Sequence, residues 1–408
     1  MEFYTDYIND LYITSLKKKI RTYLIKVEPL DHWERAITEI ARYIDSENTG
    51  QININYQQGC RRSCSLSLSD LNREFLPSEN SMFWYNRKFK LYIGVLSENN
   101  EVVFWQSQGV FITSSATSER NIVNIEAVDK FALFDGTVGL AMNDLDTMVL
   151  EKNNIRDLIS NAIISDMGNG KPIDPIMPHI DVYYNNVLTS NKIVLNNGSY
   201  LGELFTLLAT DYGADVYYDK DGHFTFSNLY TDNRALGYRL IAPQWHYDFN
   251  NSDYCNPNMS YDYSGCNSIM VVTNASDTNF ENVSYTAYNN SPQSAIRVDA
   301  VGKRWMPIEE ITLSACAKHE IKDLCRQHAE RRLAEQAMMG ASITFTSPII
   351  PHLDVNQTIS ITDDYYGLDC DLFIIQNLSI PLGSGEMSVT ACNIVNLPDT
   401  SEIGNSYL

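Results

Sequence analysis

Apolar and polar residues alternate with a period of two along much of the first third of the chain. Residues 21–27 are rich in β-forming side chains, and residues 51–56 place Ile52 and Ile54 between asparagines. Cys64, Leu66 and Leu68 continue the alternation. Between these strands, residues 37–44 carry isoleucines at helical spacing, but the segment is short, so strand or irregular structure is equally compatible.

A β-meander is predicted next. Its strands are residues 90–96, 102–113 and 122–128, separated by a polar turn at 97–100 and a polar loop at 114–121. The residues between the strands are those that tolerate tight backbone bends. The first stretch, to about residue 145, is therefore predicted to be mostly β.

The pattern changes to helical spacing in the middle of the chain. Residues 153–167 predict a helix with a stripe of Ile155, Leu158, Ile159, Ala162 and Ile163, which the breaker cluster 168–172 ends. A second helix is predicted over 199–212, with Ser199 as N-cap, Gly213 as stop, and Leu201, Leu204, Phe205 and Leu208 facing inward. Residues 214–218 and 223–227 then form a hairpin across Asp219, Lys220, Asp221 and Gly222.

The chain from residue 246 onward returns to β, interrupted by one long helix over 313–339. Thr312 or Ser314 would cap that helix and Gly340 would stop it. Its predicted inward residues are Ile321, Leu324, Cys325, Leu333 and Ala337, and Arg326, Arg331 and Arg332 lie mostly on the other face. Strands are predicted at 341–346 and 358–362.

A weak internal repeat joins the two β regions. Residues 91–128 and 358–392 both predict strand, polar turn, long strand, polar loop and strand, with residues 104–106 and 373–376 in the same place. Any antiparallel meander gives part of this pattern, so coincidence remains an alternative.

The predicted fold class is therefore mainly β with an α/β insertion. Two β-barrel-like tube domains, residues 1–145 and 246–408, would flank a small α/β domain at 146–245.

Charge and hydropathy narrow the class of protein. The formal net charge of the 408 residues is −21, which disfavours binding to nucleic acid phosphates. Such a surface serves solubility, or lines a passage through which DNA slides. No apolar run approaches the roughly 20 residues of a membrane helix. Residues 1–20 lack the pattern of a secretory signal, so we expect synthesis in the cytoplasm.

No catalytic, cofactor-binding or metal-binding constellation is evident in the sequence. Cys60 and Cys64 have no second ligand pair at zinc-site spacing, and all eight cysteines fit reduced, packed thiols. The seven histidines stand in no metalloprotease or kinase context and are interpreted as surface or satisfied histidines: His32, His179, His223, His246, His319, His328 and His352.

Three polar loops imitate ligand sites. Residues 219–222 resemble the start of a calcium loop but lack the terminal glutamate, and make good turn residues instead. Acidic pairs at Asp363, Asp364, Asp369 and Asp371 could bracket a cation, although they more simply solvate a loop. Residues 168–171 lack phosphate-loop spacing and follow a helix instead of preceding one.

Three segments resemble the tail-tip hub proteins of phages and phage-like particles. One runs from Pro351, Leu353 and Val355 through Ile361 and then over residues 373–391; the others are 199–226 and 124–136. The resemblance covers about three quarters of the chain. Each motif is structural, and their order and spacing together carry the likeness.

This resemblance implies a homotrimer with two similar barrels per subunit. Its ring of six barrels would dock on a sixfold tail tube or distal tail protein and receive a threefold spike or fibre, beside a tape measure protein. DNA would pass without specific binding, no membrane insertion by this chain is expected, and the location would be the virion tail tip, assembled in the host cytoplasm. Because the sequence stops at Leu408 without an added lysozyme or peptidase domain, no enzymatic activity is expected.

Two other functions remain open from the sequence. A tail-associated cell-wall or glycan hydrolase would need paired carboxylates, which can lie far apart in a chain. A carbohydrate receptor-binding module could use Trp84, Tyr85 and Trp105 as a platform, although such aromatics are more often core residues.

Overall fold

The structure is a computed structural model of the whole chain. It describes residues 11–16, 21, 23–39, 50–56, 59–70, 73–76, 82–83, 87–97, 101–138, 148–150, 152–166, 170–189, 193–212, 214–228, 247–261, 265–274, 283–290, 296–312, 318–337, 341–383 and 385–393. The predicted domain boundaries at 145/146 and 245/246 lie outside these residues and stay predictions.

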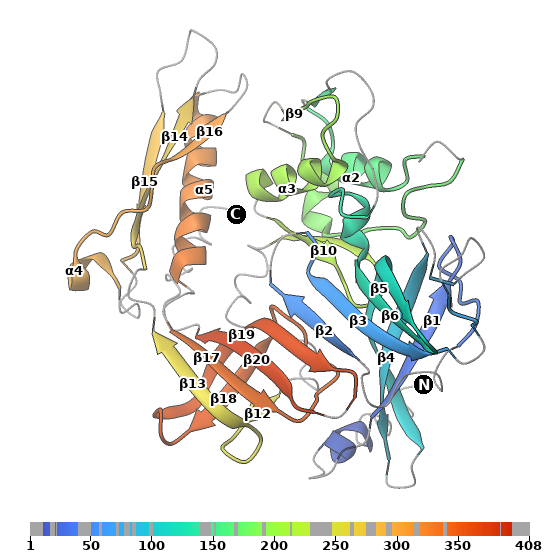
Figure 1. Ribbon diagram of the computed structural model, residues 1–408. Helices are drawn as coiled ribbons and strands as arrows, with labels where there is room; N and C mark the ends of the chain where they lie inside the picture. The colour runs from blue at the N-terminus through green and yellow to red at the C-terminus, as the bar shows by residue number, and fades with distance from the viewer. Residues whose placement is uncertain are drawn as a thin grey trace.

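The first β region forms six strands whose order in the sheet is β1-β4-β5-β6-β3-β2 (Figure 1). Period-two patterning places each strand, and buried residues alternate with partly exposed ones along β3. The bounds are β1 Tyr23–Leu30, β2 Gly50–Asn55, β3 Arg62–Ser69, β4 Lys88–Leu96, β5 Val102–Glu119 and β6 Ile122–Asp129.

The second β region repeats this order as β12-β18-β19-β20-β17-β13. Both sets contain an antiparallel meander of three consecutive strands, as the sequence repeat predicts. They differ at one edge, since β12 runs parallel to β18 while β1 runs antiparallel to β4. The bounds are β12 Asp248–Phe249, β13 Cys255–Tyr261, β17 Ala341–Ser347, β18 Thr358–Asp363, β19 Leu368–Pro381 and β20 Met387–Asn393.

A β-bulge lies at the same place in both meanders. The register shifts between Thr113 and Ser115 on β5, and between Ile375 and Asn377 on β19. Both shifts follow a residue paired with an alanine, Ala127 on β6 and Ala391 on β20. Because bulges are local insertions with a defined position, this coincidence supports a true structural repeat.

The register also corrects two details of the sequence analysis. Phe111, and not Phe104, occupies the place of Phe373. The residue after Phe111 pairs with the first residue of β4, and the residue after Phe373 pairs with the first residue of β18. The predicted loop 114–121 is wrong: β5 continues to Glu119 and leaves only a tight turn before β6. Ser115, Thr117 and Ser118 still pair with β6, so the polar composition of this segment gave a wrong prediction of a loop.

The two six-stranded sets are joined into one sheet by β2 and β19. Five residue pairs link them, from Asn55 opposite Asn377 to Gln51 opposite Pro381. One hydrophobic core runs through both sets, from Val27 and Leu66 to Phe345 and Val389. Mainly-β architecture is thus confirmed, while the strand pairings of the described residues close neither set into a barrel.

The α/β insertion covers one end of the first sheet (Figure 1). Helix α2 is capped by Asn154 and buries Ile155, Ile159 and Ile163, as its spacing predicts. Helix α3 begins at Leu201, so Tyr200 and not Ser199 precedes it, and the Glu203 carboxylate accepts from the Tyr200 N–H. The elements of the insertion are β7 Met148–Leu150, α2 Ile155–Ile163, β8 His179–Ile180, η2 Val182–Asn186, β9 Ile193–Leu195, α3 Leu201–Tyr212, β10 Ala214–Tyr218 and β11 Phe224–Asn228. The short helix η1 Lys130–Leu133 precedes the predicted insertion, but Phe131 and Leu133 belong to the same hydrophobic core.

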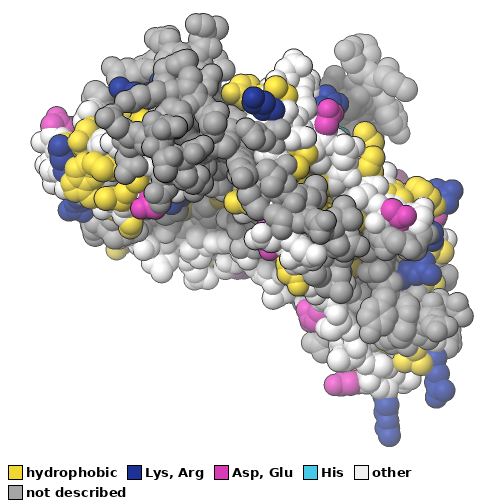
Figure 2. Space-filling view, turned by 90° about the horizontal axis from the view of Figure 1, so that it is seen from above, with side chains coloured by type: hydrophobic (Ala, Val, Ile, Leu, Met, Phe, Trp, Pro, Cys, Tyr) yellow, Lys and Arg dark blue, Asp and Glu magenta, His cyan; other side chains and the backbone are white. Residues whose placement is uncertain are grey.

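A further small unit, which the sequence analysis did not separate, is inserted between β13 and β17. We call it the α5 module; it comprises β14 Ser268–Asn274, β15 Ser284–Tyr288, α4 Val298–Val301, β16 Glu309–Thr312 and α5 Lys318–Ala337. Its own core joins Ile321, Cys325, Ala329 and Leu333 of α5 to the three-stranded sheet. Figure 2 shows hydrophobic side chains gathering at the end of the molecule formed by this module. Exposed apolar residues there are Tyr288, Val301, Trp305 and Ile308.

The predicted helix 313–339 is described only over α5. Of its predicted caps, Thr312 is the last residue of β16 and lies opposite Asn274, whereas Ser314 and Gly340 lie outside the described residues. The side chains of Leu324, Arg331 and Ala337 are also outside the described part. Arg326 and Arg332 are partly exposed and pair with Asp323 and Glu309. Among the described residues, no helix is both long and apolar enough to cross a membrane.

Candidate functional site

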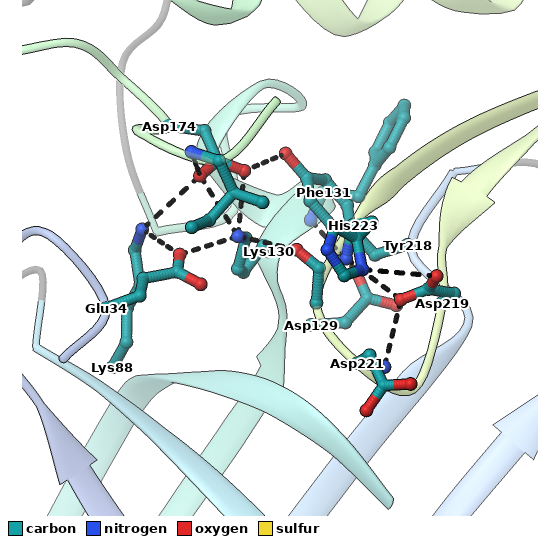
Figure 3. Close-up of polar contacts among 12 residues, drawn as sticks. Glu34, Lys88, Asp129, Lys130, Phe131, Asp174, Tyr218, Asp219, Asp221 and His223 are labelled. Carbon is teal, nitrogen blue, oxygen red and sulfur yellow. Dashed lines mark hydrogen bonds and ion pairs between the residues drawn. The ribbon is translucent and has the colours of Figure 1, made fainter. Parts of the chain in front are cut away.

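A cluster of buried charges lies where the first sheet meets the α/β insertion (Figure 3). Glu34 follows β1, Lys88 begins β4 and Lys130 begins η1, while Asp174 follows α2 and Tyr218 ends β10. We call these five residues the junction cluster. Its charged side chains are at most 6% exposed, so they interact in an environment that water hardly screens.

Lys130 links the two sides of the junction cluster. Its Nζ lies 2.6 Å from Glu34 Oε1 and 2.8 Å from Asp174 Oδ2, and donates to the Gly222 carbonyl at 2.7 Å. Lys88 Nζ also lies 2.6 Å from Glu34 Oε1. Tyr218 donates its hydroxyl to Asp174 Oδ2 at 2.7 Å. Two cations thus balance two carboxylates, which is the condition under which burial of charge is tolerable.

The surroundings shift the ionisation of these groups. Burial, reinforced by the nearby Lys130 ammonium, lowers the pKa of Lys88. Burial acts to raise the pKa of Asp174, but the charges of Lys130 and Lys88, with hydrogen bonds from Lys130 and the Ile176 N–H, outweigh it, so that pKa lies below its usual range. Asp174 therefore remains a carboxylate at neutral pH and holds the lysines in place.

Two consecutive arginines extend the network across the molecule. Arg61 pairs with Asp215 of β10 and stacks over Tyr217, whose ring centroid lies 4.0 Å from its guanidinium carbon. Arg62 points the other way: it donates to the Tyr218 carbonyl at 2.7 Å and pairs with Asp354, between β17 and β18. One dipeptide therefore contacts the first sheet, the insertion and the second β region.

Asp129 fixes the backbone of that dipeptide. Its Oδ2 accepts from the N–H groups of Arg61 and Arg62 at 2.7 and 2.8 Å, and its Oδ1 caps η1 through the Phe131 N–H. Burial raises the pKa of Asp129, and the backbone donors act in the opposite direction. This arrangement sets the direction in which the two arginines leave the sheet.

The turn between β10 and β11 inserts into the junction. Lys220 donates to the His352 carbonyl at 3.0 Å, and Asp221 pairs with Lys90 at 3.1 Å. Gly222 has φ +89°, and a Cβ there would lie 2.5 Å from Val110 Cγ2. The predicted turn is confirmed, and it contacts both the first sheet and the second β region.

The junction cluster connects the first sheet to the α/β insertion. The four charged side chains of the junction cluster are buried and paired with one another. No local sequence motif predicts the junction cluster, because its members are scattered from residue 34 to residue 218. Lysine and arginine at the inward positions of period-two strands, such as Lys88 and Arg62, were the available signal.

The other sequence candidates are distributed as follows. Cys64 is a buried strand residue, as predicted, and burial raises the pKa of its thiol. Cys255 and Cys370 are exposed, so the prediction of packed thiols is wrong for these two. Cys316, Trp84, Tyr85 and His246 lie outside the described residues.

The remaining loops make internal contacts. Asp363 accepts from the Tyr365 and Tyr366 N–H groups and from the Tyr254 hydroxyl, which is turn chemistry. Gly170 donates its N–H to Asp166 at 2.9 Å, while residues 168–169 lie outside the described part.

Solved structures with a similar fold include phage tail proteins. The chain is similar to the tail protein from Neisseria meningitidis MC58, with a TM-score of 0.55 and 10% identity over 92% of this chain and 98% of that one. It is equally similar to the prophage MuSo2 43 kDa tail protein from Shewanella oneidensis, with a TM-score of 0.54 and 10% identity over 92% and 99%.

A third similar structure is the Francisella PdpA-VgrG complex, with a TM-score of 0.53 and 10% identity over 93% of this chain and 54% of that one. By sequence, the chain matches no protein-family model and no curated protein. The chain therefore has the fold of phage tail proteins, which confirms the fold expected from the three resembling segments.

Proposed function

We propose that the chain is a structural hub protein at the tip of a phage tail or phage-derived injection machine, working as a homotrimeric ring. The observation that carries this proposal is the repeat of strand order and bulge position in the two β regions. Two equivalent units per chain give six around a threefold axis, which matches a sixfold tube on one face and a threefold spike or fibre on the other.

The joint between the two units within the chain suggests how subunits join. There, β2 of the first unit pairs with the part of β19 that lies beyond β18. By strand order, β13 is the equivalent of β2, and β5 is the equivalent of β19. Among the described strands, β13 pairs only with β17, and residues 113–119 of β5 pair only with β6. In the described part of the chain, β13 and this part of β5 each have one neighbouring strand, and we propose that a neighbouring subunit supplies the second.

The ladders also give the register of the proposed contact. Ile52 of β2 lies opposite Cys64 on β3, and Met259 of β13 lies opposite Ile343 on β17. Since Ile343 occupies the position of Cys64 in the repeat, Met259 occupies the position of Ile52. Carrying the β2–β19 pairing onto these positions sets Ser260 of one subunit opposite Thr117 of the next. An antiparallel contact of this kind would cover two strand edges that otherwise invite aggregation.

The charge of the chain suits a passage for DNA. At a net charge of −21, a bore lined by this protein repels the phosphates of a duplex and keeps it mobile, without specific binding. The proposal requires Arg326, Arg331 and Arg332 to point away from the bore. A tail tube or distal tail protein, a tape measure protein and a spike or fibre are the proposed partners. The similarity to a chain in a PdpA-VgrG complex supports a role in such assemblies.

We propose no catalytic role for the chain, in keeping with buried charges that satisfy one another. Hydrolysis of peptidoglycan by the pure protein, lost on a single carboxylate substitution, would contradict this. A carbohydrate platform has less support, because Trp105 packs against Gly94 and lies near the Lys26 ammonium group.

Engineered cysteines test the ring directly. Opposed residues in an antiparallel pair have Cα atoms about 4.5–5.5 Å apart, within the reach of a disulfide. We expect the double variant Ser260→Cys with Thr117→Cys to give disulfide-linked trimers under mild oxidation. The single variants, and Ser260→Cys with Ser114→Cys, control for chance collisions and for the exposed Cys255 and Cys370. Crosslinking equal to these controls, in a protein that is monomeric by native mass spectrometry, would refute this interface.

A further inference from the structure

Two histidines far apart in the sequence come together beside the β10–β11 turn. His179 begins β8, which pairs in parallel with β11 so that His179 lies opposite Thr225. His223 directly precedes β11, two residues before Thr225, and therefore projects from the same face. The two imidazole rings are nearly parallel, with centroids 4.1 Å apart.

The Asp219 carboxylate faces both rings. Its Oδ1 accepts from the backbone N–H groups of Asp221 and His223, each at 2.9 Å, and these bonds shape the turn. Its Oδ2 lies 3.7 Å from His179 Nδ1 and 3.5 Å from His223 Nδ1. Figure 3 shows Asp219 and His223 facing each other across the turn. His223 Nδ1 is buried and makes no hydrogen bond among the described residues.

We propose that His179, His223 and Asp219 form a site for a divalent late transition-metal ion, with Zn²⁺ as the best fit. Bonds of about 2.0–2.1 Å in a tetrahedral geometry separate ligand atoms by about 3.4 Å. The distances of 3.5 and 3.7 Å are close to this value. Since ring lone pairs lie in the ring plane, the imidazoles must tilt toward each other. The His179 side chain is 61% exposed and has room to do so.

The ligand types set the class of ion. Imidazole nitrogen suits zinc, copper and nickel, whereas Ca²⁺ and Mg²⁺ require mostly oxygen ligands. Three protein ligands leave a fourth position for water. The ion would tie β8 to the turn whose backbone contacts Lys130 and Ser107, and so would stiffen the junction. No sequence motif predicts the proposed site, because β8 and the turn become neighbours only in the fold.

The test uses the full chain, freed of metal by a chelator and titrated with Zn²⁺ by calorimetry, with Co²⁺ absorption as a second readout of geometry. Asp219→Asn keeps the oxygen that accepts the two turn hydrogen bonds and replaces the ligand oxygen. His179→Ala changes an exposed side chain. Asp221→Asn, which removes a carboxylate from the same turn but not from the site, is the matched control.

We expect one Zn²⁺ per chain, and affinity at least about tenfold weaker in His179→Ala and in Asp219→Asn, since even the loss of an outer partner costs roughly 10- to 100-fold. Asp221→Asn should bind like the parent. Circular dichroism would verify that each variant is folded. The proposal would be overturned if the parent chain did not bind Zn²⁺, or if both ligand variants bound Zn²⁺ as tightly as the parent chain does. It would also be overturned if the parent chain bound Ca²⁺ more tightly than Zn²⁺.

Discussion

The Lys130 ammonium group has three buried acceptors, and its removal should destabilise the protein strongly. In Lys130→Met, Asp174 loses its closest cation and Glu34 keeps only Lys88. Breaking a buried pair by removing one partner costs about 3–5 kcal/mol, because the remaining charge stays desolvated. Urea unfolding measures this loss. Arg35→Ala breaks a largely exposed pair with Asp31 and should change stability little. Equal losses in the two variants would contradict the assigned role.

Gly222 meets two separate requirements, a positive φ and contact with Val110. Gly222→Ala should therefore lower the free energy of unfolding by about 2 kcal/mol or more, from backbone strain and overpacking together. Gly170→Ala is the matched control, since Gly170 has φ +73° but nothing within 4 Å of an added Cβ. Gly170→Ala should lower the free energy of unfolding only through the backbone strain of a positive φ, by about 1 kcal/mol. Comparison of the two urea midpoints separates the steric effect from the conformational one.

Asp174 makes stability depend on pH in the acid range. Its pKa in the folded chain lies below the value of about 3.9 expected when unfolded. The unfolded state then binds the proton more tightly, so this contribution is complete above the unfolded pKa and is lost as pH falls through the folded pKa. We expect Asp174→Asn to be less stable than the parent at pH 7, with the difference shrinking below about pH 4. A difference that stays constant between pH 7 and pH 3 would count against this.

At the scale of elements, strands and helices with strong periodicity were predictable from sequence. Ile155, Ile159 and Ile163 lie on the buried face of α2, and the residues after Tyr218 form the expected turn. Long polar strands were not predictable from sequence. Residues 114–119 of β5 are stabilised by pairing with β6, and this pairing is not visible in their own polar composition. The junction cluster was missed for the same reason: ion pairs between distant residues leave no periodic trace.

The α5 module should unfold before the rest of the chain. Its core is separate from the large core of the two β regions, and regions with few shared contacts open locally. Leu333→Ala, at a buried position on α5, should cost about 2–5 kcal/mol of local stability. Hydrogen exchange should then accelerate in β14, β15, β16 and α5 only. Leu207→Ala, at an exposed position on α3, should leave exchange unchanged.

At the scale of the whole molecule, the repeated units would allow the proposed ring to present six similar units around a threefold axis. Each unit presents the same strand order, and the β2–β19 joint shows that two units can share a continuous sheet. The sequence repeat suggested this arrangement, but only the ladder registers fixed which residues are equivalent. The proposed pairing of β13 with β5 of the next subunit is derived from those registers.

The most direct test of the central claim is an electron cryomicroscopy structure of the particle that carries this chain. We expect three copies around the tail axis, with β13 of each subunit antiparallel to residues 115–119 of β5 in the next, and an acidic or neutral bore. One or two copies in the intact tail, a solvent-facing β5 edge, or a bore lined by Arg326, Arg331 and Arg332 would contradict it.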